Sequence, residues 1–510
     1  MSSTVEGSDQ AVIRTLIPAR MDRLPWSRFH TRLVTALGVA WILDGLEITV
    51  ASAVAGVLST KQTLGMSSTA VGAIATVYLV GEVIGALFFG RLADALGRRN
   101  LFMVTLGVYL VGSGLSALTL GAGTGWVLYL YATRIVAGMG IGGEYAAINS
   151  AIDEMIPARY RGRVDIAVNG TYWGGAVLGT LGSLLLLNVL SESVGWRLGF
   201  LIGPVLAVVV LFVRRNLPES PRWLIMHGRE AQAEATIREI EQDVAGSGHE
   251  LSEPPKDAML EIKPADRTGY LTLVRVLFSQ YPGRSTLGAT LMITQSFLYN
   301  AIFFTYTLVL TKFYGLKASA APWYLIAFAV GNLLGPLTLG RLFDTLGRKK
   351  MIAGTYLISG VLLAVTAKLF EAGVLTALTQ TLAWCVVFFF ASCGASAAYL
   401  TVSEIFPLEV RAQAIAVFFA IAQCFGALGP VLYGHLIGSG HDPHMLFIGY
   451  LIGAGAMILG GLVEILLGVA AERLNLEAIA KPLSAIRTAS ASTSASVRTG
   501  TGVAGAHARS

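Results

Sequence analysis

Long apolar segments alternate with short polar stretches along most of the chain. Twelve apolar segments are close to or above the roughly 20 residues that a helix needs to cross a bilayer, and they lie at 33–58, 69–90, 101–120, 125–150, 164–190, 196–214, 285–311, 321–341, 351–370, 376–402, 412–436 and 445–470. A polar stretch at 215–284 separates the first six from the last six. The pattern predicts an all-α membrane protein whose twelve transmembrane helices form two six-helix bundles.

The polar segments predict the domain organisation. We expect an N-terminal cytoplasmic segment, a first bundle, a cytoplasmic linker, a second bundle and a disordered tail, at 1–28, 29–214, 215–284, 285–471 and 472–510. The first segment has no apolar core of the kind that a signal peptide needs. In the linker, Ala, Glu and Ile at helical spacing between Arg229 and Val244 predict a short amphipathic helix. The tail is rich in Ala, Ser, Thr and Gly, a composition typical of disorder.

Charged residues are scarce and unevenly placed. They make up 13% of the 510 residues, about half the share in an average soluble protein. If both termini are cytoplasmic, 31 of the 37 Lys and Arg lie on that side, and those outside are Lys61, Arg197, Lys312, Lys317 and Lys368. This asymmetry fits the positive-inside rule. We therefore predict a multi-pass plasma-membrane protein, which would lie in the inner membrane if the cell is Gram-negative. We ascribe the net charge of +6 to topology rather than to nucleic-acid binding.

The two halves of the chain repeat each other. Residues 80–99 recur as 330–349 at an offset of 250, with 11 of 20 positions identical. The same offset relates Glu154, Pro157 and Arg161 to Glu404, Pro407 and Arg411. Two six-helix halves built on one plan suggest a transporter whose halves rock around a central site.

Several motifs resemble those of one transporter family. The pattern G-R-L-x-D-x-L-G-R at 90–98 and 340–348 resembles the loop signature of the major facilitator superfamily. Other motifs resemble its sugar porter branch, namely Pro218–Leu224, Arg134-x3-Gly138-x-Gly140-x-Gly142, Gln295-x4-Asn300 and Ser403–Pro407. Gly142-Gly143-Glu144 and Asp44-x2-Glu47 are similar instead to relatives that carry organic acids with protons. The resemblance covers about residues 30–470 and implies that fold and alternating access.

Charged residues of the repeated loops predict a cytoplasmic gate. Asp94 and Arg98, like Asp344 and Arg348, are four apart, so each pair can meet across one helical turn. Glu154 and Glu404 each precede a base by seven residues across a helix-breaking Pro, and those bases are Arg161 and Arg411. We expect these eight residues to form ion pairs that close the cytoplasmic face. The alternative is that they only anchor the loops in water and fix the topology.

Two acids in the first span predict the site of energy coupling. Asp44 and Glu47 are three apart and share a helix face, although a charge at the bilayer centre costs about 2.5–3.5 kcal/mol. Arg134 is the only base in the interior of a predicted span and lies at a depth comparable to that of Glu47, so we expect the two to pair. The resemblance gives Glu47 the role of proton acceptor, in place of the family's Asp. The alternative is a permanent salt bridge that only joins the two helices.

Two further acids lie within spans. Glu144 is ten residues beyond Arg134, too far along the helix to be its partner. It either contributes to proton movement, as in the acid-carrying relatives, or faces a solvated cavity. Glu82 corresponds to Asn332 in the second half, and it either pairs with the gate or lines a wet cavity.

The resemblance also implies a substrate pocket. Gln295 and Asn300 match positions that hydrogen-bond sugar hydroxyls, Asn169 replaces a glutamine and Tyr399 replaces a tryptophan. We add the nearby polar and aromatic residues Tyr299, Trp384 and Gln423. Phe297 and Leu298 stand where the branch has Ser-Gly, which favours a less hydroxylated ligand.

These features predict a proton-coupled importer of a small organic metabolite. A sugar, a polyol, or a monocarboxylic or aromatic acid is compatible. A dianion is poorly accommodated unless Arg134 is diverted to it, because no base lies in the interior of a span of the second half. We expect the proton gradient as the only energy source, no metal, no cofactor and a functional monomer. No enzyme motif is present. The alternatives are proton-antiport efflux of amphipathic compounds and a nutrient sensor that binds without transporting.

Overall fold

Helices account for most of the residues that the structure describes. The structure, a computed structural model, describes residues 13–58, 63–66, 68–214, 217–248, 250–254, 258–262, 270–316, 321–407, 410–437 and 442–480. The first bundle consists of α2 (Arg28–Leu58), α3 (Ser68–Leu96), α4 (Arg98–Ala117), α5 (Thr124–Met155), α6 (Ala158–Gly170), α7 (Tyr172–Val189) and α8 (Glu192–Arg214). The second consists of α12 (Pro282–Tyr314), α13 (Ala321–Leu339), α14 (Leu342–Thr345), α15 (Arg348–Glu371), α16 (Ala377–Ile405), α17 (Arg411–Gly426), α18 (Leu428–Ile437) and α19 (Pro443–Leu467).

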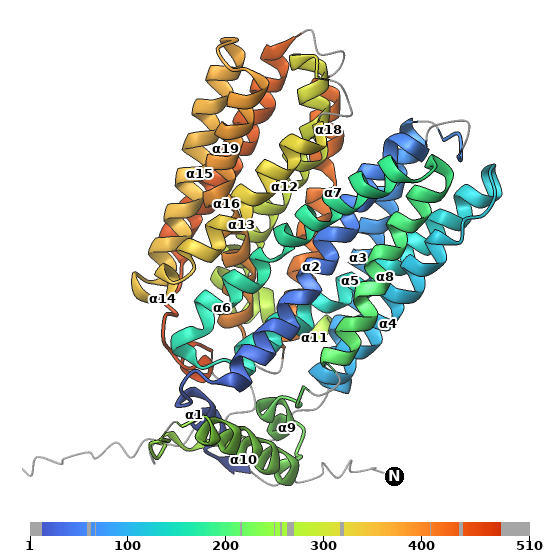
Figure 1. Cartoon of the computed structure of the whole chain (residues 1–510). Helices are drawn as coiled ribbons and strands as arrows, with labels where there is room; N and C mark the ends of the chain where they lie inside the picture. Colours follow the sequence, from blue (N-terminus) through green and yellow to red (C-terminus); the bar gives the residue numbers. More distant parts are fainter. Residues whose placement is uncertain are drawn as a thin grey trace, which may run out of the picture.

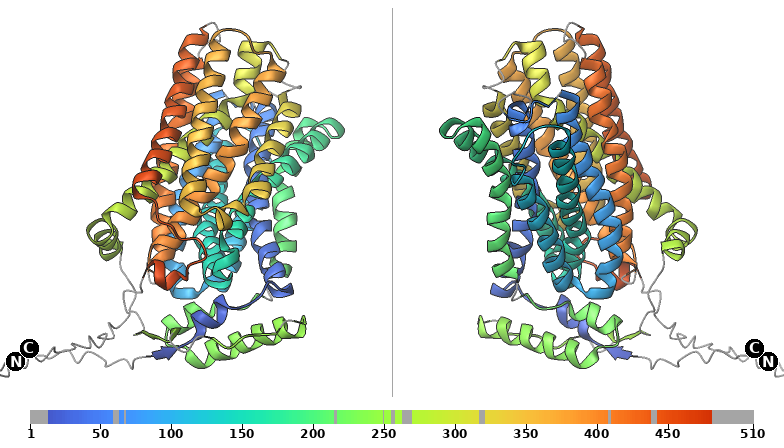
Figure 2. Two further views of the ribbon diagram at one scale, coloured as in Figure 1. Left: turned by 90° about the vertical axis from the view of Figure 1, so that its left-hand side faces the viewer. Right: turned by 90° about the vertical axis from the view of Figure 1, so that its right-hand side faces the viewer.

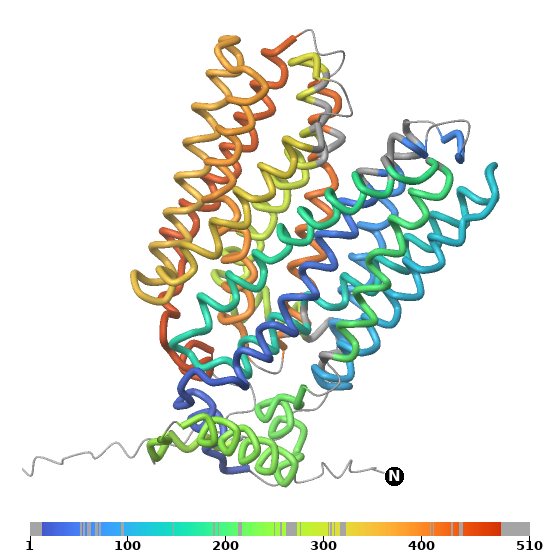
Figure 3. Tube along the Cα trace, viewed as in Figure 1, coloured from blue at the N-terminus to red at the C-terminus, as the bar shows by residue number. Residues whose placement is uncertain are grey.

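The predicted fold class is confirmed. Each of the twelve apolar segments corresponds to one helix, or to a pair where a span is interrupted, as at α6–α7 and α17–α18. Eight helices in the described ranges are individually long and apolar enough to cross a bilayer. The two bundles lie side by side, the first blue to green and the second yellow to red (Figures 1 and 3).

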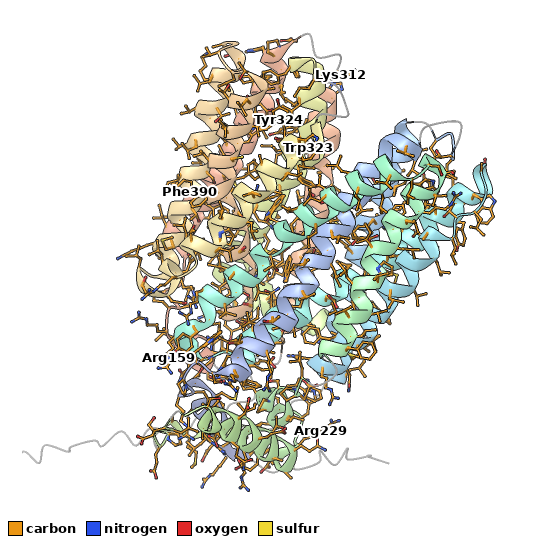
Figure 4. All side chains as sticks on the ribbon, in the orientation of Figure 1. Arg159, Arg229, Lys312, Trp323, Tyr324 and Phe390 are labelled. Atoms are coloured by element: carbon orange, nitrogen blue, oxygen red, sulfur yellow. The ribbon has the colours of Figure 1, made fainter. Side chains whose placement is uncertain are left out.

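Short elements cover one end of the bundles, which we call the linker face. They are β1 (Ile13–Thr15), α1 (Ile17–Asp22), α9 (Pro221–Met226), α10 (Glu230–Gly246), β2 (Leu260–Ile262) and α20 (Leu476–Ile479). The amphipathic helix expected in the linker is present as α10, which lies across the bundle end (Figure 2) and buries Ala233, Ile237, Ile240 and Val244. The linker also contains α11 (Tyr270–Arg275) and a π-helix at Val276–Gln280. Figure 4 places Arg159 and Arg229 toward this face and Lys312 at the opposite end.

Two details of the linker face differ from the prediction. β1 and β2 form an antiparallel ribbon in which Arg14 pairs with Glu261 at 2.8 Å, so the chain is not helical throughout. The start of the expected disordered tail is ordered through Ala480, because Glu477 of α20 accepts a hydrogen bond from Arg222 at 3.2 Å. The rest of the tail lies outside the described residues.

The internal repeat is visible in side-chain geometry. Arg98 lies 2.6 Å from Glu154 in the first half, and the equivalent Arg348 lies 2.9 Å from Glu404 in the second. These residues join α4 to α5 and α15 to α16, so each half uses the same ion pair at the linker face.

Glycines bring α3 and α5 into backbone contact around Glu82. A Cβ at Gly138 would lie 2.2 Å from the carbonyl oxygen of Tyr78, and one at Gly142 would lie 2.1 Å from that of Glu82. Only glycine permits this approach, which is a common device for packing membrane helices. This close packing fixes the position of Glu82 in the bundle.

Candidate functional site

A cavity of about 120 Å³ lies between the two bundles. Its walls come from both halves of the chain. Six of the seven residues predicted for the substrate pocket line it, and they are Asn169 of α6, Gln295, Tyr299 and Asn300 of α12, Tyr399 of α16 and Gln423 of α17. No Lys or Arg is among the described residues that line the cavity.

Hydrogen bonds hold most of these polar side chains in place. Tyr299 donates to Asn332 Oδ1 at 3.0 Å, and Asn169 donates to the Asp165 carboxylate at 3.0 Å. Gln295 forms no side-chain hydrogen bond to the described residues, so its amide is available to a ligand in the cavity. Although Gln295 and Asn300 lie far apart around their helix, both reach the same cavity.

Aromatic residues missed in the sequence form much of the wall. They are Trp41, Tyr145, Tyr172, Trp173 and Phe303. Trp173 is separated from Gln423 by the repeat offset of 250, so the internal repeat could have pointed to it. Nothing in the sequence distinguishes the others from aromatic residues that face lipid. Their flat faces suit a ligand that contains a ring.

The prediction that Trp384 lines the substrate pocket is wrong. Trp384 is fully buried in the second bundle, with ring centroids 4.9 Å from Tyr306 and 6.2 Å from Tyr450. The repeat explains its position, because Trp384 and Tyr450 are the equivalents of Arg134 and Phe200, which also contact each other, at 4.6 Å. Trp384 therefore occupies the place that the first half gives to its buried arginine.

The interpretation of Phe297 and Leu298 is also wrong. Leu298 is fully buried in the second bundle, and Phe297 packs against the ring of Tyr433 at 6.3 Å. Neither residue lines the cavity, so neither restricts the ligand directly.

Glu47 and Arg134 form a buried ion pair between α2 and α5. Their exposed fractions are 1% and 0%. Tyr109 donates to the second carboxylate oxygen of Glu47 at 2.8 Å, and Ser113 donates to the oxygen shared with Arg134 at 2.9 Å. Arg134 also donates to Ser116 at 3.0 Å. The pair is thus surrounded by hydroxyl groups from α4.

Asp44 belongs to a different cluster from that of Glu47. It is 2% exposed and accepts hydrogen bonds from Tyr145 and, at 3.3 Å, from Tyr78. No cation among the described residues pairs with it. Because Tyr145 also lines the cavity, a single hydroxyl group connects Asp44 to the ligand site.

The other two acids lie close to Asp44. Glu144 is buried on α5 next to Tyr145 and interacts electrostatically with Asp44, so it is not solvated as one interpretation held. Glu82 is also buried and accepts a hydrogen bond from Gln423 at 2.8 Å. Its neighbour is therefore a cavity residue of the second bundle and not a gate residue.

The gate residues gather at the linker face and connect the two bundles. Arg161 of α6 lies 3.4 Å from Glu404 of α16, and Arg411 of α17 lies 4.0 Å from Asp153 of α5. Asp344 of α14 accepts from the backbone N–H groups of residues 162 and 163 at 3.1 and 2.8 Å. It also pairs with Arg348 across one turn at 2.5 Å. The bundles are therefore held together at this face.

The sequence predicted most of the charged residues that meet at the linker face, and their role as a gate stays a prediction. The side chain of Asp94 lies outside the described residues, so its predicted pair with Arg98 is not observed. Asp153 and Asp22 were missed, although both lie near Arg161, at 4.0 and 3.6 Å. Burial of Asp153 could not be inferred from its polar sequence context.

The family model described as "Sugar (and other) transporter" matches residues 31–481. The chain belongs to this family. It is accordingly a transporter of the major facilitator superfamily, related to the sugar porters, and not an enzyme. The resemblance inferred from the loop motifs is confirmed.

Curated relatives match over most of their length. The niacin transporter NiaP of Acinetobacter baylyi is 25% identical over 462 residues, which cover 90% of this chain and 99% of the relative. The glucose transporter GlcP of Staphylococcus epidermidis is 27% identical and matches over 77% of this chain and 85% of its own. Among solved structures, the proton:xylose symporter XylE bound to 6-bromo-6-deoxy-D-glucose aligns with a TM-score of 0.73 at 22% identity, over 88% of this chain and 99% of that one.

Proposed function

We propose that the chain is a proton-coupled symporter that imports a small, ring-containing metabolite across the plasma membrane, with the linker face in the cytoplasm. The observation that carries this proposal is the charge balance beside the cavity. Arg134 has one carboxylate partner, Glu47, while Asp44 is equally buried and has no cation among the described residues. A buried carboxylate without a cationic partner is expensive, so Asp44 favours binding a proton.

The arrangement supports a mechanism of alternating access. With the gate pairs formed, the cavity is closed toward the linker face, and substrate reaches it from the opposite side. Separation of Arg161 from Glu404 and of Asp153 from Arg411 opens the linker face. The same rocking changes the spacing of the helices around Glu47 and Asp44, and so changes how strongly each acid holds a proton.

The named relatives support the substrate class. A niacin transporter, a glucose transporter and a proton:xylose symporter all take small polar rings, which suits a cavity with aromatic walls and amide groups. The lack of lining cations disfavours dianions. A sugar, a polyol or an aromatic monocarboxylate remains compatible, and we propose no narrower class here.

The proposal is tested in proteoliposomes. A thermal-shift screen that begins with nicotinate, D-glucose and D-xylose identifies a ligand, and its uptake is followed under an imposed pH gradient. Glu47→Gln is expected to abolish accumulation yet retain counterflow exchange, because exchange needs no net proton movement. Glu464→Gln, which removes a buried carboxyl of α19, is the matched control and retains both. Unchanged accumulation in Glu47→Gln refutes the coupling role, and absent counterflow in the wild type indicates a sensor.

A further inference from the structure

Glu82 is a buried acid that neither the ion pair nor the gate uses. It lies in the middle of α3 with an exposed fraction of 0%. Its Oε2 accepts from the amide of Gln423, while its Oε1 has no hydrogen-bond partner in the described part of the chain. Because Gln423 belongs to α17, this hydrogen bond joins the first bundle to the second.

A continuous hydrogen-bond chain leads from Glu82 into the cavity. Ser296 donates from its hydroxyl to Gln423 Oε1 at 2.9 Å, and the Asn300 amide lies 3.2 Å from the same hydroxyl oxygen. Gln423, Ser296 and Asn300 all line the cavity. A change at Glu82 can therefore reach a ligand without direct contact between the ligand and the acid.

In the described part of the chain, no cation lies beside Glu82 that could keep it charged. The ionisable groups that act on it electrostatically are one acid and four phenols, namely Asp44 of α2, Tyr78 of α3, Tyr145 of α5, Tyr172 of α7 and Tyr399 of α16. The helix α17 contributes the neutral Gln423. Arg134 of α5 is engaged by Glu47. Glu82 thus sits where a single proton changes the local charge.

The repeat shows that packing does not require an acid here. The equivalent position in the second half is Asn332, which accepts a hydrogen bond from the cavity residue Tyr299 at 3.0 Å. Both halves therefore place a polar group behind the cavity wall at this position, but only the first half places one that can titrate.

The amide of Gln423 can both donate and accept, so the hydrogen bonds from Glu82 to Ser296 can run in either direction. A carboxylate only accepts hydrogen bonds, whereas a carboxylic acid also donates one. With Glu82 ionised, the Gln423 NH2 group donates to it and the amide oxygen accepts from Ser296, as in the structure. With Glu82 protonated, a half-turn of the amide brings its oxygen to the acid's O–H group. Its NH2 group then donates to Ser296, whose own hydrogen becomes available to the cavity.

We propose that Glu82 and Gln423 form a proton-operated switch that sets whether Ser296 offers a hydrogen-bond acceptor or a donor to the substrate. The inference rests on the proposed symport and deepens it. A proton on Glu82 removes a negative charge near a cavity with no lining cation, and it adds a hydroxyl donor there. Both changes favour a substrate that presents an oxygen or ring-nitrogen acceptor, including a monocarboxylate. Proton and substrate therefore bind together.

Infrared difference spectroscopy tests the switch on the full chain in lipid, without a ligand. Comparison of the wild type with Glu82→Gln isolates the protonated-carboxyl band of Glu82, which is expected to disappear as pH rises. Comparison with Gln423→Leu isolates the amide carbonyl band of Gln423, which is expected to shift with the same midpoint. The control Glu464→Gln retains both changes. Glu82→Asn, which copies the second half, is an alternative variant if Glu82→Gln does not fold.

Two results overturn the proposal. One is a Glu82 band that does not titrate, and the other is a Glu82 band that titrates while the Gln423 band stays fixed. Because these spectra need neither substrate nor a pH gradient across a membrane, they remain informative even if uptake proves independent of protons. Once a ligand is known, its affinity should fall up to tenfold for each pH unit above the midpoint, and this fall should vanish in Glu82→Gln.

Discussion

Arg134 and Trp384 occupy equivalent positions in a duplicated fold and have diverged in chemistry. The first half surrounds its position with Glu47, Tyr109 and Ser113, whereas the second fills it with an aromatic cluster. A buried ion pair stabilises a protein little compared with apolar packing. Its retention in one half only is therefore best explained by the proton-coupling role proposed for it.

Gln295 lines the cavity whereas Trp384 packs inside the second bundle, so substitutions of these two buried residues are expected to have different effects. Gln295→Leu is expected to raise the KM for substrate about tenfold, because a hydrogen bond to the ligand is lost in the cavity. Trp384→Phe is expected to leave KM unchanged and to reduce the free energy of unfolding by roughly 1–3 kcal/mol. Uptake kinetics and thermal unfolding in detergent check both. A changed KM in Trp384→Phe would mean that the indole belongs to the ligand site after all.

Single residues were predictable where the chemistry is restrictive. One arginine in an apolar span needs an acid at its own depth, so Glu47 could be assigned to Arg134 before the structure was known. The partners of Asp44 and Glu82 could not, because they are tyrosine and glutamine residues on other helices. Apolar spans do not reveal which of their faces meet.

At the scale of elements, glycine spacing determines where helices touch. The contact of α3 with α5 depends on Gly142, since a Cβ there would come within 2.1 Å of the Glu82 carbonyl oxygen. Gly114 of α4 has nothing within 4 Å of its Cβ position. The two glycines therefore differ in what they contribute, although both lie in apolar helices.

Gly142→Ala is accordingly expected to lower the thermal unfolding midpoint and to impair uptake, because α3 must move away from α5 together with Glu82. Gly114→Ala is the matched control and is expected to leave both unchanged. Thermal unfolding and initial uptake rates provide the measurements. Equal behaviour of the two variants would show that the α3–α5 contact tolerates the extra methyl group.

The helices of the bundles could be predicted from the sequence, but the small elements could not. Runs of about 20 apolar residues are an unambiguous signal. Strands of three residues, such as β1 and β2, carry no periodicity, and their pairing links residues about 250 positions apart. The turn α20 depends on Glu477 meeting Arg222, a contact between the tail and the linker.

At the scale of the whole molecule, ion pairs join the two bundles at the linker face. Glu404 contacts both Arg161 of the first bundle and Arg348 of the second, at 3.4 and 2.9 Å. Removal of the Glu404 charge therefore weakens both its ion pair with Arg161 of the other bundle and its ion pair with Arg348 of its own bundle. The gate proposed from the repeated loops therefore depends heavily on this residue.

Glu404→Gln is expected to shift the population toward a state with an open linker face. Spin labels at Arg159→Cys and Lys350→Cys, one in each bundle, report the separation by electron paramagnetic resonance in a background without native cysteines. Longer distances are expected in Glu404→Gln. The control Glu371→Gln, which removes a partly exposed partner of Lys368 at 2.7 Å, should not change them. Identical distance distributions in all three proteins would contradict the gate.

Proton movement during downhill substrate flow is the most direct test of the account. Proteoliposomes with no initial pH gradient are given an inward gradient of an identified substrate, and the internal pH is recorded. The wild type is predicted to acidify the interior as substrate enters, whereas Asp44→Asn and Glu47→Gln carry no protons with it. Substrate entry without acidification in the wild type would contradict proton symport through these buried acids.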